Sequence, residues 1–250
     1  VYMPSASYIK KHQFGGVLIM KPHLKDTLHL KEKLNLANES LKIPLLTAID
    51  QEGGKVNRLQ AISPEWKNLP SAKEMRIMAD DSVYNLAKLI GNALHHYGIN
   101  LNLAPVLDPP KDSKGKPSFI EVSNRSFGEF ETAVPKIRAF VQGMKESKVL
   151  STSKHFPGYD SWTNSDHQIA FSTSSKDVIL KNVELFKEFA DEIPVIMLSS
   201  VRFVRLSNTP AVFNPKITAM AREISPYTVL LTDDLWGVSL RAWISGTDKV

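Results

Sequence analysis

Short apolar runs alternate with longer amphipathic stretches along this chain, and this alternation is the strongest constraint on its fold. Each run is apolar at consecutive positions and rich in leucine or β-branched residues, which is typical of strands buried on both faces of a parallel sheet. The runs are Gly16–Met20, Leu45–Ile49, Asn100–Leu103, Val149–Thr152, Val195–Leu198 and Val229–Thr232. We therefore predict six strands of one parallel sheet.

Between these runs, apolar residues recur at three- and four-residue spacing, which predicts helices. The predicted helices are Ser71–Tyr97, Thr132–Ser147, Lys176–Asp191 and Pro215–Glu223. Alternating strands and helices indicate βαβ units. Polar residues follow several of the strands. In a flat doubly wound sheet they would gather at one switch point, so this distribution favours a TIM-type (β/α)₈ barrel.

A complete barrel of this type has eight strands, two more than the clear apolar runs. The first strand would precede Val1, and Lys249–Val250 would begin another, so we expect a barrel that is incomplete at its first and last strands. The segment Trp236–Thr247 is short for a loop followed by a helix. Because no linker, repeat or low-complexity tract interrupts the chain, residues 1–250 are predicted to form a single domain.

The amino-acid composition excludes several classes of protein. Hydrophobic residues make up 42% and charged residues 23%, as in ordinary globular proteins, and no apolar run approaches the roughly 20 residues that span a bilayer. The absence of cysteine removes disulfides, thiolate metal sites and cysteine nucleophiles. The net charge of +5 is spread along the chain without a basic cluster interleaved with aromatics, so no nucleic-acid partner is predicted.

Charged residues follow three of the predicted strands. Asp50 comes directly after the second run, within a segment that also holds Glu52 and two glycines, and a helix-capping turn explains that spacing equally well. Lys154 and His155 follow the fourth run, and the Pro157-Gly158 pair behind them stops any helix from continuing. These side chains are expected at the mouth of the barrel, where active sites collect.

Two loops add further candidates. Arg125, in Asn124–Gly128, offers a planar fork of donors suited to sugar hydroxyls or a carboxylate. His167 follows Ser165 and Asp166, and a histidine beside an acid can act as a general acid or base, although a surface histidine in a polar loop is the commoner situation.

Asp233 and Asp234 leave a fully apolar run, and carboxylates in that position are costly unless something uses them. Two uses fit the residues alone. A carboxylate can serve as the nucleophile of a glycosidase. Alternatively, the acids could bind a metal ion together with His155 and His167.

Taken in order, these segments resemble family 3 glycoside hydrolases, and within them the bacterial β-N-acetylglucosaminidase (NagZ-like) or β-hexosaminidase branch. The resemblance covers nearly the whole chain and is specific because the motifs keep their order and spacing. They are GGVLIM (15–20), IDQEGGKVNRL (49–59), GINLNLAPVLD (98–108), NRSFG (124–128), KHFPG (154–158), TPAVFNPK (209–216) and TDDL (232–235).

The resemblance implies a retaining hydrolase that removes terminal β-linked N-acetylglucosamine, from peptidoglycan-derived muropeptides or chitooligosaccharides. Asp233 would be the nucleophile and His167 the acid/base, while the terminal sugar would be bound by Asp50, Arg58, Arg125, Lys154 and His155. No metal or cofactor is implied, because carboxylate, imidazole and water suffice. The resemblance further implies a single catalytic domain, expected to act as a monomer on a carbohydrate, in the bacterial cytoplasm or exported to the cell surface.

The chain departs from the family pattern around His167. The family loop carries an Asp two residues before the histidine, where this chain has Ser165; Asp166 lies one place nearer to His167. Tyr159 and Asp160 replace a His-Gly pair, and Ser200 replaces a histidine. Either Asp166 or Ser165 would have to partner His167, so an impaired homologue that binds amino sugar or cell-wall fragments without turnover is the alternative. A further alternative is an enzyme of the same fold that acts on another β-linked sugar.

Overall fold

The computed structural model describes residues 4–39 and 41–246. These residues form an α/β fold around a six-stranded sheet in which neighbouring strands are all parallel, in the order β1-β2-β3-β4-β6-β8. The strands are β1 (Gly16–Ile19), β2 (Leu46–Ile49), β3 (Leu101–Asn102), β4 (Leu150–Phe156), β6 (Val195–Leu198) and β8 (Val229–Thr232). All six predicted strands are confirmed, and β4 continues through Lys154 and His155.

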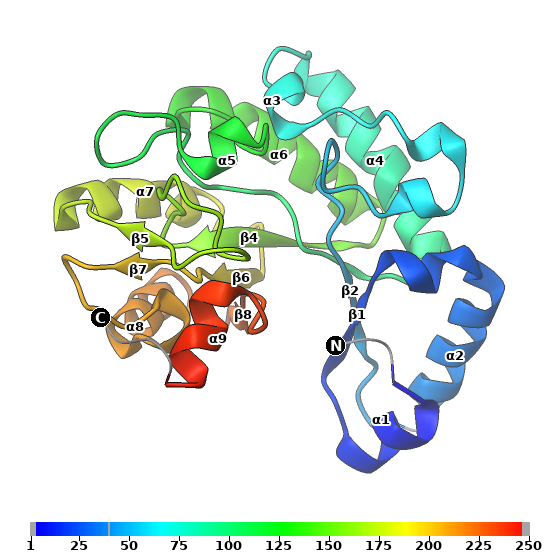
Figure 1. The fold of residues 1–250 in the computed structure, drawn as a ribbon. Coiled ribbons are helices and arrows are strands. Elements are labelled where there is room, and N and C mark those ends of the chain that lie inside the picture. Colours follow the sequence, from blue (N-terminus) through cyan, green and yellow to red (C-terminus); the bar gives the residue numbers. More distant parts are fainter. Residues whose placement is uncertain (1–3, 40, 247–250) are drawn as a thin grey trace.

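The helices lie along the outside of the sheet, which curls, with the two ends of the sheet on opposite sides of the view in Figure 1. Apart from short 3₁₀ turns, they are α1 (Ala6–His12), α2 (Thr27–Glu39), α3 (Ala72–Met75), α4 (Asp80–His96), α5 (Phe119–Val122), α6 (Phe130–Glu146), α7 (Lys176–Glu188), α8 (Pro215–Ile224) and α9 (Val238–Ile244). Both the helical layer and the parallel order fit the predicted βαβ arrangement.

Two predicted elements differ from the structure. The expected helix Ser71–Tyr97 is two helices: α3 starts at a reciprocal capping box of Ser71 and Glu74, and the extended backbone of Ala79 (ψ 148°) separates it from α4. The segment Trp236–Thr247 was expected to be too short for a loop and a helix, yet it holds the seven residues of α9. The predicted strand at Lys249–Val250 lies outside the described residues, as does the one expected before Val1.

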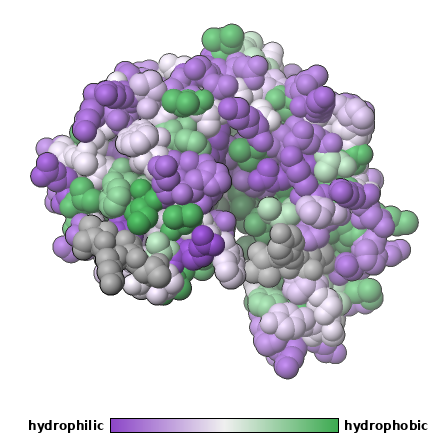
Figure 2. All heavy atoms as spheres, viewed as in Figure 1, coloured by the Kyte–Doolittle hydropathy of each residue, from purple (hydrophilic) through white to green (hydrophobic). Residues whose placement is uncertain are grey.

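The sheet separates two hydrophobic cores. The larger core lies between the sheet and the helices, and Gly143 of α6 lets this helix approach α4 so closely that an added Cβ would stand 2.6 Å from the Tyr84 carbonyl oxygen. The smaller core, on the concave face, consists of Leu101, Leu103, Val195 and Met197. β8, at one edge, is only partly covered, and Figure 2 shows the surface hollowed between the two ends of the sheet.

A second, two-stranded sheet lies beside the ends of the main strands. It pairs β5 (Phe171–Ser172) with β7 (Arg202–Phe203) in parallel. The Arg202 guanidinium carbon lies 5.5 Å from the Phe171 ring centre and 5.3 Å from that of Trp243 in α9, so this cation ties the small sheet to the last described helix. None of the described helices is both long and apolar enough to cross a membrane.

Candidate active site

The predicted site residues are placed by strands that run the same way. Asp50 follows β2, Lys154 and His155 end β4, and Asp233 follows β8. Because the strands are parallel, their carboxyl ends share one edge of the sheet, and these residues are placed along that edge although they are distant in sequence.

A cluster of charges links β2, β4 and the loop after α5. The Lys154 ammonium lies 2.7 Å from Asp50 Oδ1 and 2.5 Å from Glu52 Oε1. The Arg125 guanidinium donates from Nε to Glu52 Oε2 (2.8 Å) and from Nη2 to Glu52 Oε1 (2.7 Å), a bidentate pair. Arg58 Nη2 approaches Asp50 Oδ2 at 3.4 Å.

Local hydrogen bonds explain how the loop after β2 brings Arg58 back to Asp50. The Gln51 side-chain oxygen accepts the backbone N–H groups of Arg58 (2.7 Å) and Leu59 (3.0 Å). The side chain of Asn102 in β3 in turn holds the backbone N–H and C=O of Gln51, at 3.0 and 2.9 Å. The loop is therefore pinned to the neighbouring strand, and its charged side chains are held in fixed positions.

Charge pairing decides the protonation of this cluster. Burial disfavours an ionised Glu52, but Arg125 and Lys154 outweigh burial and hold the pKa of Glu52 well below its usual range. Burial likewise opposes a charged Lys154, and the carboxylates of Asp50 and Glu52 nevertheless raise the pKa of its ammonium. Both groups are therefore ionised at neutral pH and form a buried ion pair.

His155 is held by a second carboxylate that sequence reasoning did not include among the site residues. Asp108 Oδ2 lies 2.6 Å from His155 Nδ1, and Asp108 Oδ1 accepts the backbone N–H groups of His155 (2.8 Å) and Tyr159 (2.7 Å). All three residues are buried. A His Nδ1 directed at a carboxylate fixes the ring and leaves Nε2 as the ring nitrogen that can interact with a ligand.

The Tyr159 hydroxyl makes two hydrogen bonds to the loop that carries His167. The Tyr159 hydroxyl donates to the Thr163 carbonyl (2.6 Å) and accepts the Ser165 backbone N–H (2.8 Å). Burial, followed by the charges of Asp233 and Asp108, raises the pKa of Tyr159.

Backbone hydrogen bonds join the same loop to the segment after β8. Ser239 N–H donates to the Ser165 carbonyl (3.0 Å) and Val238 N–H to the Asp166 carbonyl (3.2 Å). The surrounding protein, and then the charges of Asp233 and Asp234, raise the pKa of Asp166. The segment that follows Asp233 is thus hydrogen-bonded to the loop that carries His167, although the two are more than 60 residues apart in sequence.

The two acids after β8 have different surroundings. Asp233 is half-buried and its Oδ1 accepts the Asp234 N–H at 2.8 Å, whereas Asp234 is exposed and its Oδ1 accepts the Trp236 N–H at 2.9 Å. Asp234 therefore shapes the turn, and the second carboxylate oxygen of Asp233 makes no hydrogen bond to the described residues. Across the described residues, the His167 ring makes no hydrogen bond to Asp166 or Ser165.

Sequence reasoning brought together most of this site but overlooked Glu52 and Asp108 as site residues. Both lay within quoted motifs, and a carboxylate directly after a buried strand or an apolar segment was the available signal. Ser200, which stands where the resembling family has a histidine, is buried and its carbonyl accepts the Ser239 hydroxyl at 2.9 Å. It helps to anchor the start of α9.

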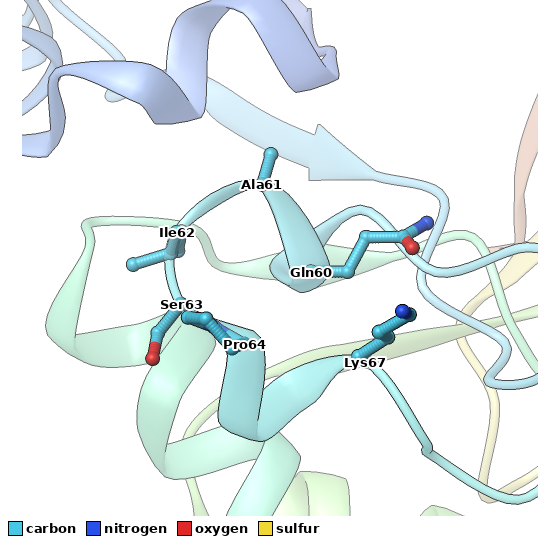
Figure 3. Close-up of a pocket in the computed structure, with 6 residues that line it drawn as sticks. All are labelled: Gln60, Ala61, Ile62, Ser63, Pro64 and Lys67. Carbon is cyan, nitrogen blue, oxygen red and sulfur yellow. The ribbon is translucent and has the colours of Figure 1, made fainter.

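A surface hollow of about 440 Å³ lies elsewhere, between the 3₁₀ turns Leu59–Ala61 and Pro64–Trp66 (Figure 3). It is lined by Gln60, Ala61, Ile62, Ser63, Pro64 and Lys67, and none of the predicted site residues lines it. The convergence of charged side chains, rather than this hollow, identifies the candidate site. Over the described ranges, no group of three or more His, Cys, Asp or Glu side chains is arranged to hold a metal ion.

Comparison with known proteins gives one family. The model of the glycosyl hydrolase family 3 N terminal domain matches residues 3–231. A β-hexosaminidase of Pseudomonas aeruginosa is 28% identical over 238 residues, which cover 91% of this chain and 68% of that protein.

Solved structures agree with this match. The β-N-acetylhexosaminidase of Beutenbergia cavernae has a TM-score of 0.76 and 26% identity, covering 87% of this chain and 67% of that one. A family 3 β-N-acetylglucosaminidase of Paenibacillus has a TM-score of 0.81 and 25% identity, covering 95% of this chain and 46% of that one.

Proposed function

The chain belongs to glycosyl hydrolase family 3, and from this premise we propose that it is a retaining β-N-acetylhexosaminidase that removes terminal β-linked N-acetylglucosamine. The single observation that carries the proposal is that Asp233 follows β8 at the same edge of the parallel sheet at which Asp50, Glu52, Arg125 and Lys154 form their charged cluster. Within the described residues Asp233 makes no ion pair, whereas Asp50 and Glu52 are both paired with cations.

In the proposed mechanism Asp233 attacks the anomeric carbon, the bond to the leaving oxygen breaks, and a glycosyl-enzyme forms. The loop Ser165–His167 supplies the proton to the leaving oxygen and later removes one from water, a role that the family resemblance assigns to His167. Water then displaces Asp233 from the anomeric carbon. Two inversions give net retention.

The terminal sugar would be held by Asp50, Arg58, Arg125, Lys154 and His155. Side-chain exposure divides the cluster: Asp50 and Arg58 are 24% and 20% exposed, whereas Lys154 is 2% exposed. Asp50 and Arg58 would therefore contact sugar hydroxyls directly, while the buried Lys154 orients Asp50. Because both carboxylate oxygens of Asp50 already face cations, a hydroxyl that donates to Asp50 would meet a strongly oriented acceptor.

The curled parallel sheet supports the further proposal that it is part of a (β/α)₈ barrel, formed by residues 1–250 as one catalytic domain. We expect this domain to act as a monomer on a carbohydrate and not to bind nucleic acid. The substrates would be peptidoglycan-derived muropeptides or chitooligosaccharides. The names of the curated relatives favour turnover over the alternative of an impaired homologue that only binds sugar.

The proposal is tested with 4-nitrophenyl β-N-acetylglucosaminide and the corresponding β-glucoside. We expect the purified protein to release nitrophenol from the first and not from the second. Asp233→Ala should reduce the rate by on the order of 10⁴-fold, because the attacking carboxylate is removed. Asp234→Asn, which keeps an acceptor for the Trp236 N–H, should stay within about tenfold of the wild type.

Other outcomes would overturn the assignment. Equal turnover of the glucoside would refute the specificity for the N-acetyl sugar. Sugar binding by calorimetry without turnover would favour the impaired homologue. Full activity of Asp233→Ala would refute the nucleophile.

A further inference from the structure

The position of His167 depends on the backbone of its loop. The His167 side chain is exposed, and within the described residues its ring makes no hydrogen bond. Ser165 stands where the resembling family has an aspartate two residues before the histidine. A general acid must lie within hydrogen-bonding reach of the leaving oxygen. The groups that fix the backbone next to His167 therefore bear on the proposed proton transfer.

The Tyr159 hydroxyl holds this backbone from the side of β4. It donates to the Thr163 carbonyl (2.6 Å) and accepts the Ser165 N–H (2.8 Å), so it is used both as donor and as acceptor by the loop. Tyr159, Thr163 and Ser165 are all buried. Without the hydroxyl, two buried backbone groups would lose their partner, and the loop would have to move to regain hydrogen bonds.

Tyr159 is itself fixed by residues that hold His155. Asp108 Oδ1 accepts the Tyr159 backbone N–H at 2.7 Å, and Oδ2 of the same carboxylate lies 2.6 Å from His155 Nδ1. The Tyr159 ring packs edge-on against the His155 ring, with 5.7 Å between the ring centres and 66° between the ring planes. The loop is therefore held at a defined place relative to a residue of the proposed sugar-binding group.

The start of α9 holds the same backbone from the side of β8. The Ser239 N–H donates to the Ser165 carbonyl (3.0 Å), and the Val238 N–H donates to the Asp166 carbonyl (3.2 Å). The N–H of Ser165 is thus bound by Tyr159, and its carbonyl by the helix that follows the proposed nucleophile. The loop is fixed between two of the strand ends that form the candidate site.

We infer that the Tyr159 hydroxyl is a positioning group for the proton transfer; this inference rests on the proposed function. By binding Thr163 and Ser165, the hydroxyl sets where the loop presents its acid/base, the role that the family resemblance gives to His167. Both hydrogen bonds of the hydroxyl go to the loop and none to the sugar-binding residues. Its removal should slow the step that needs a proton and leave sugar binding unchanged.

The test uses Tyr159→Phe, which removes the hydroxyl and keeps the ring against His155. The matched control is Tyr84→Phe on α4, which also removes a hydroxyl with two partners, here Glu146 and Lys88. Circular dichroism first establishes that both variants fold.

Two substrates separate proton transfer from the rest of the reaction. The leaving group of N,N′-diacetylchitobiose needs a proton, whereas that of 4-nitrophenyl β-N-acetylglucosaminide does not. We expect Tyr159→Phe to lower kcat/KM on chitobiose by about 10–10²-fold, because a misplaced acid protonates the leaving oxygen poorly. Its kcat/KM on the nitrophenyl substrate and its affinity for N-acetylglucosamine, measured by calorimetry, should stay within about threefold of the wild type. Tyr84→Phe should match the wild type in all three measurements.

Val238→Pro tests the other side of the loop and keeps the inference testable if Tyr159→Phe does not fold. Val238 is the first residue of α9, where proline is favoured, and Gly237 already has the extended backbone that suits a residue before proline (φ −56°, ψ 146°). The substitution removes the N–H that binds the Asp166 carbonyl. We expect the same selective loss on chitobiose, and faster amide exchange in peptides that cover residues 163–168 for both variants.

Equal losses on both substrates, or weaker binding of N-acetylglucosamine, would overturn the inference, because Tyr159 would then support the whole site. Unchanged chitobiose turnover in Tyr159→Phe, or in Val238→Pro if Tyr159→Phe does not fold, would overturn it as well, and this inference alone. A wild type that turns over neither substrate would refute the proposed function and the inference with it.

Discussion

At the scale of single residues, the site depends on charges that are buried together. Glu52 and Lys154 side chains are 4% and 2% exposed and lie 2.5 Å apart, and Arg125 closes the group with two hydrogen bonds to Glu52. Burying any one of these charges alone would cost several kcal/mol, so each is tolerable only because the others are present. The cluster is therefore fixed before substrate arrives.

Removing one member should expose this mutual dependence. Glu52→Gln should lower the free energy of unfolding by about 3–5 kcal/mol, because Arg125 would lose its paired carboxylate and Lys154 would keep only Asp50. Urea denaturation measures the change. The matched control is Glu184→Gln, whose partner Lys187 is exposed and 2.8 Å away; it should change stability by less than about 0.5 kcal/mol. Equal effects of the two substitutions would contradict the prediction.

Asp160 is a buried carboxyl whose pKa is raised, whereas that of Glu52 is lowered. Its Oδ2 accepts the Ser174 hydroxyl, its Oδ1 is buried without a hydrogen bond within the described structure, and burial raises its pKa. A carboxyl whose pKa is raised on folding stabilises the fold below its ordinary pKa of 3.8, and this contribution is lost as the pH rises through the raised value.

Asp160→Asn should therefore be more stable than the wild type at neutral pH, and the difference should shrink as the pH falls toward about 4. Thermal unfolding from pH 4 to pH 8 measures this. Asp191→Asn, at an exposed carboxyl, should show no such trend. A gain in the stability of Asp160→Asn that is independent of pH would show that ionisation of Asp160 is not its cause.

At the scale of elements, the turn after β2 decides where Glu52 points. Gly53 and Gly54 have φ values of +96° and +51°, and a Cβ at Gly53 would stand 2.1 Å from the Pro70 carbonyl oxygen. Glycine is therefore required at position 53 both for its backbone conformation and for the close approach of the segment before α3.

Gly53→Ala should consequently destabilise the protein more than Gly115→Ala. Gly115 also has a positive φ, +75°, but an added Cβ there would meet nothing within 4 Å. The control should cost about 1 kcal/mol for the backbone alone, and Gly53→Ala should cost more and weaken sugar binding by displacing Glu52. Urea denaturation and calorimetry test both effects. Equal costs would show that the approach of Pro70 is unimportant.

At the scale of the whole molecule, the sheet is unevenly protected. Within the described residues, β4 and β6 pair with a strand on each side, while β1 and β8 pair on one side only. All four residues of β6 are buried, whereas none of β8 is. The candidate active site thus lies at the ends of both well protected strands and a less protected one.

Amide hydrogen exchange should reflect this difference in the 250-residue chain. Exchange should be slowest in Thr152–Phe156 and Val195–Leu198 and faster in Val229–Thr232, because local opening at an edge strand exposes fewer buried contacts. Mass spectrometry of peptides that cover these strands measures the rates. Protection of β8 equal to that of β6 would contradict the prediction.

The sequence alone determined the order of strands and helices and the family motifs. Strand and helix periodicity are local properties, since a few consecutive side chains decide which faces are apolar. The six predicted strands were therefore correct, and Asp50, Lys154, His155 and Asp233 could be assigned to strand ends. The single helix predicted over Ser71–Tyr97 was wrong because the backbone at Ala79 is extended, whereas the apolar period continues through the break.

Only the tertiary structure decided which of these residues act together. Glu52 meets Arg125 across 73 residues of sequence, and Asp108 meets His155 across 47. Likewise, the backbone N–H of Val238 meets the carbonyl of Asp166 from a distant part of the sequence. Such contacts arise from the parallel packing of distant strands, and local periodicity contains no information about the distance between them.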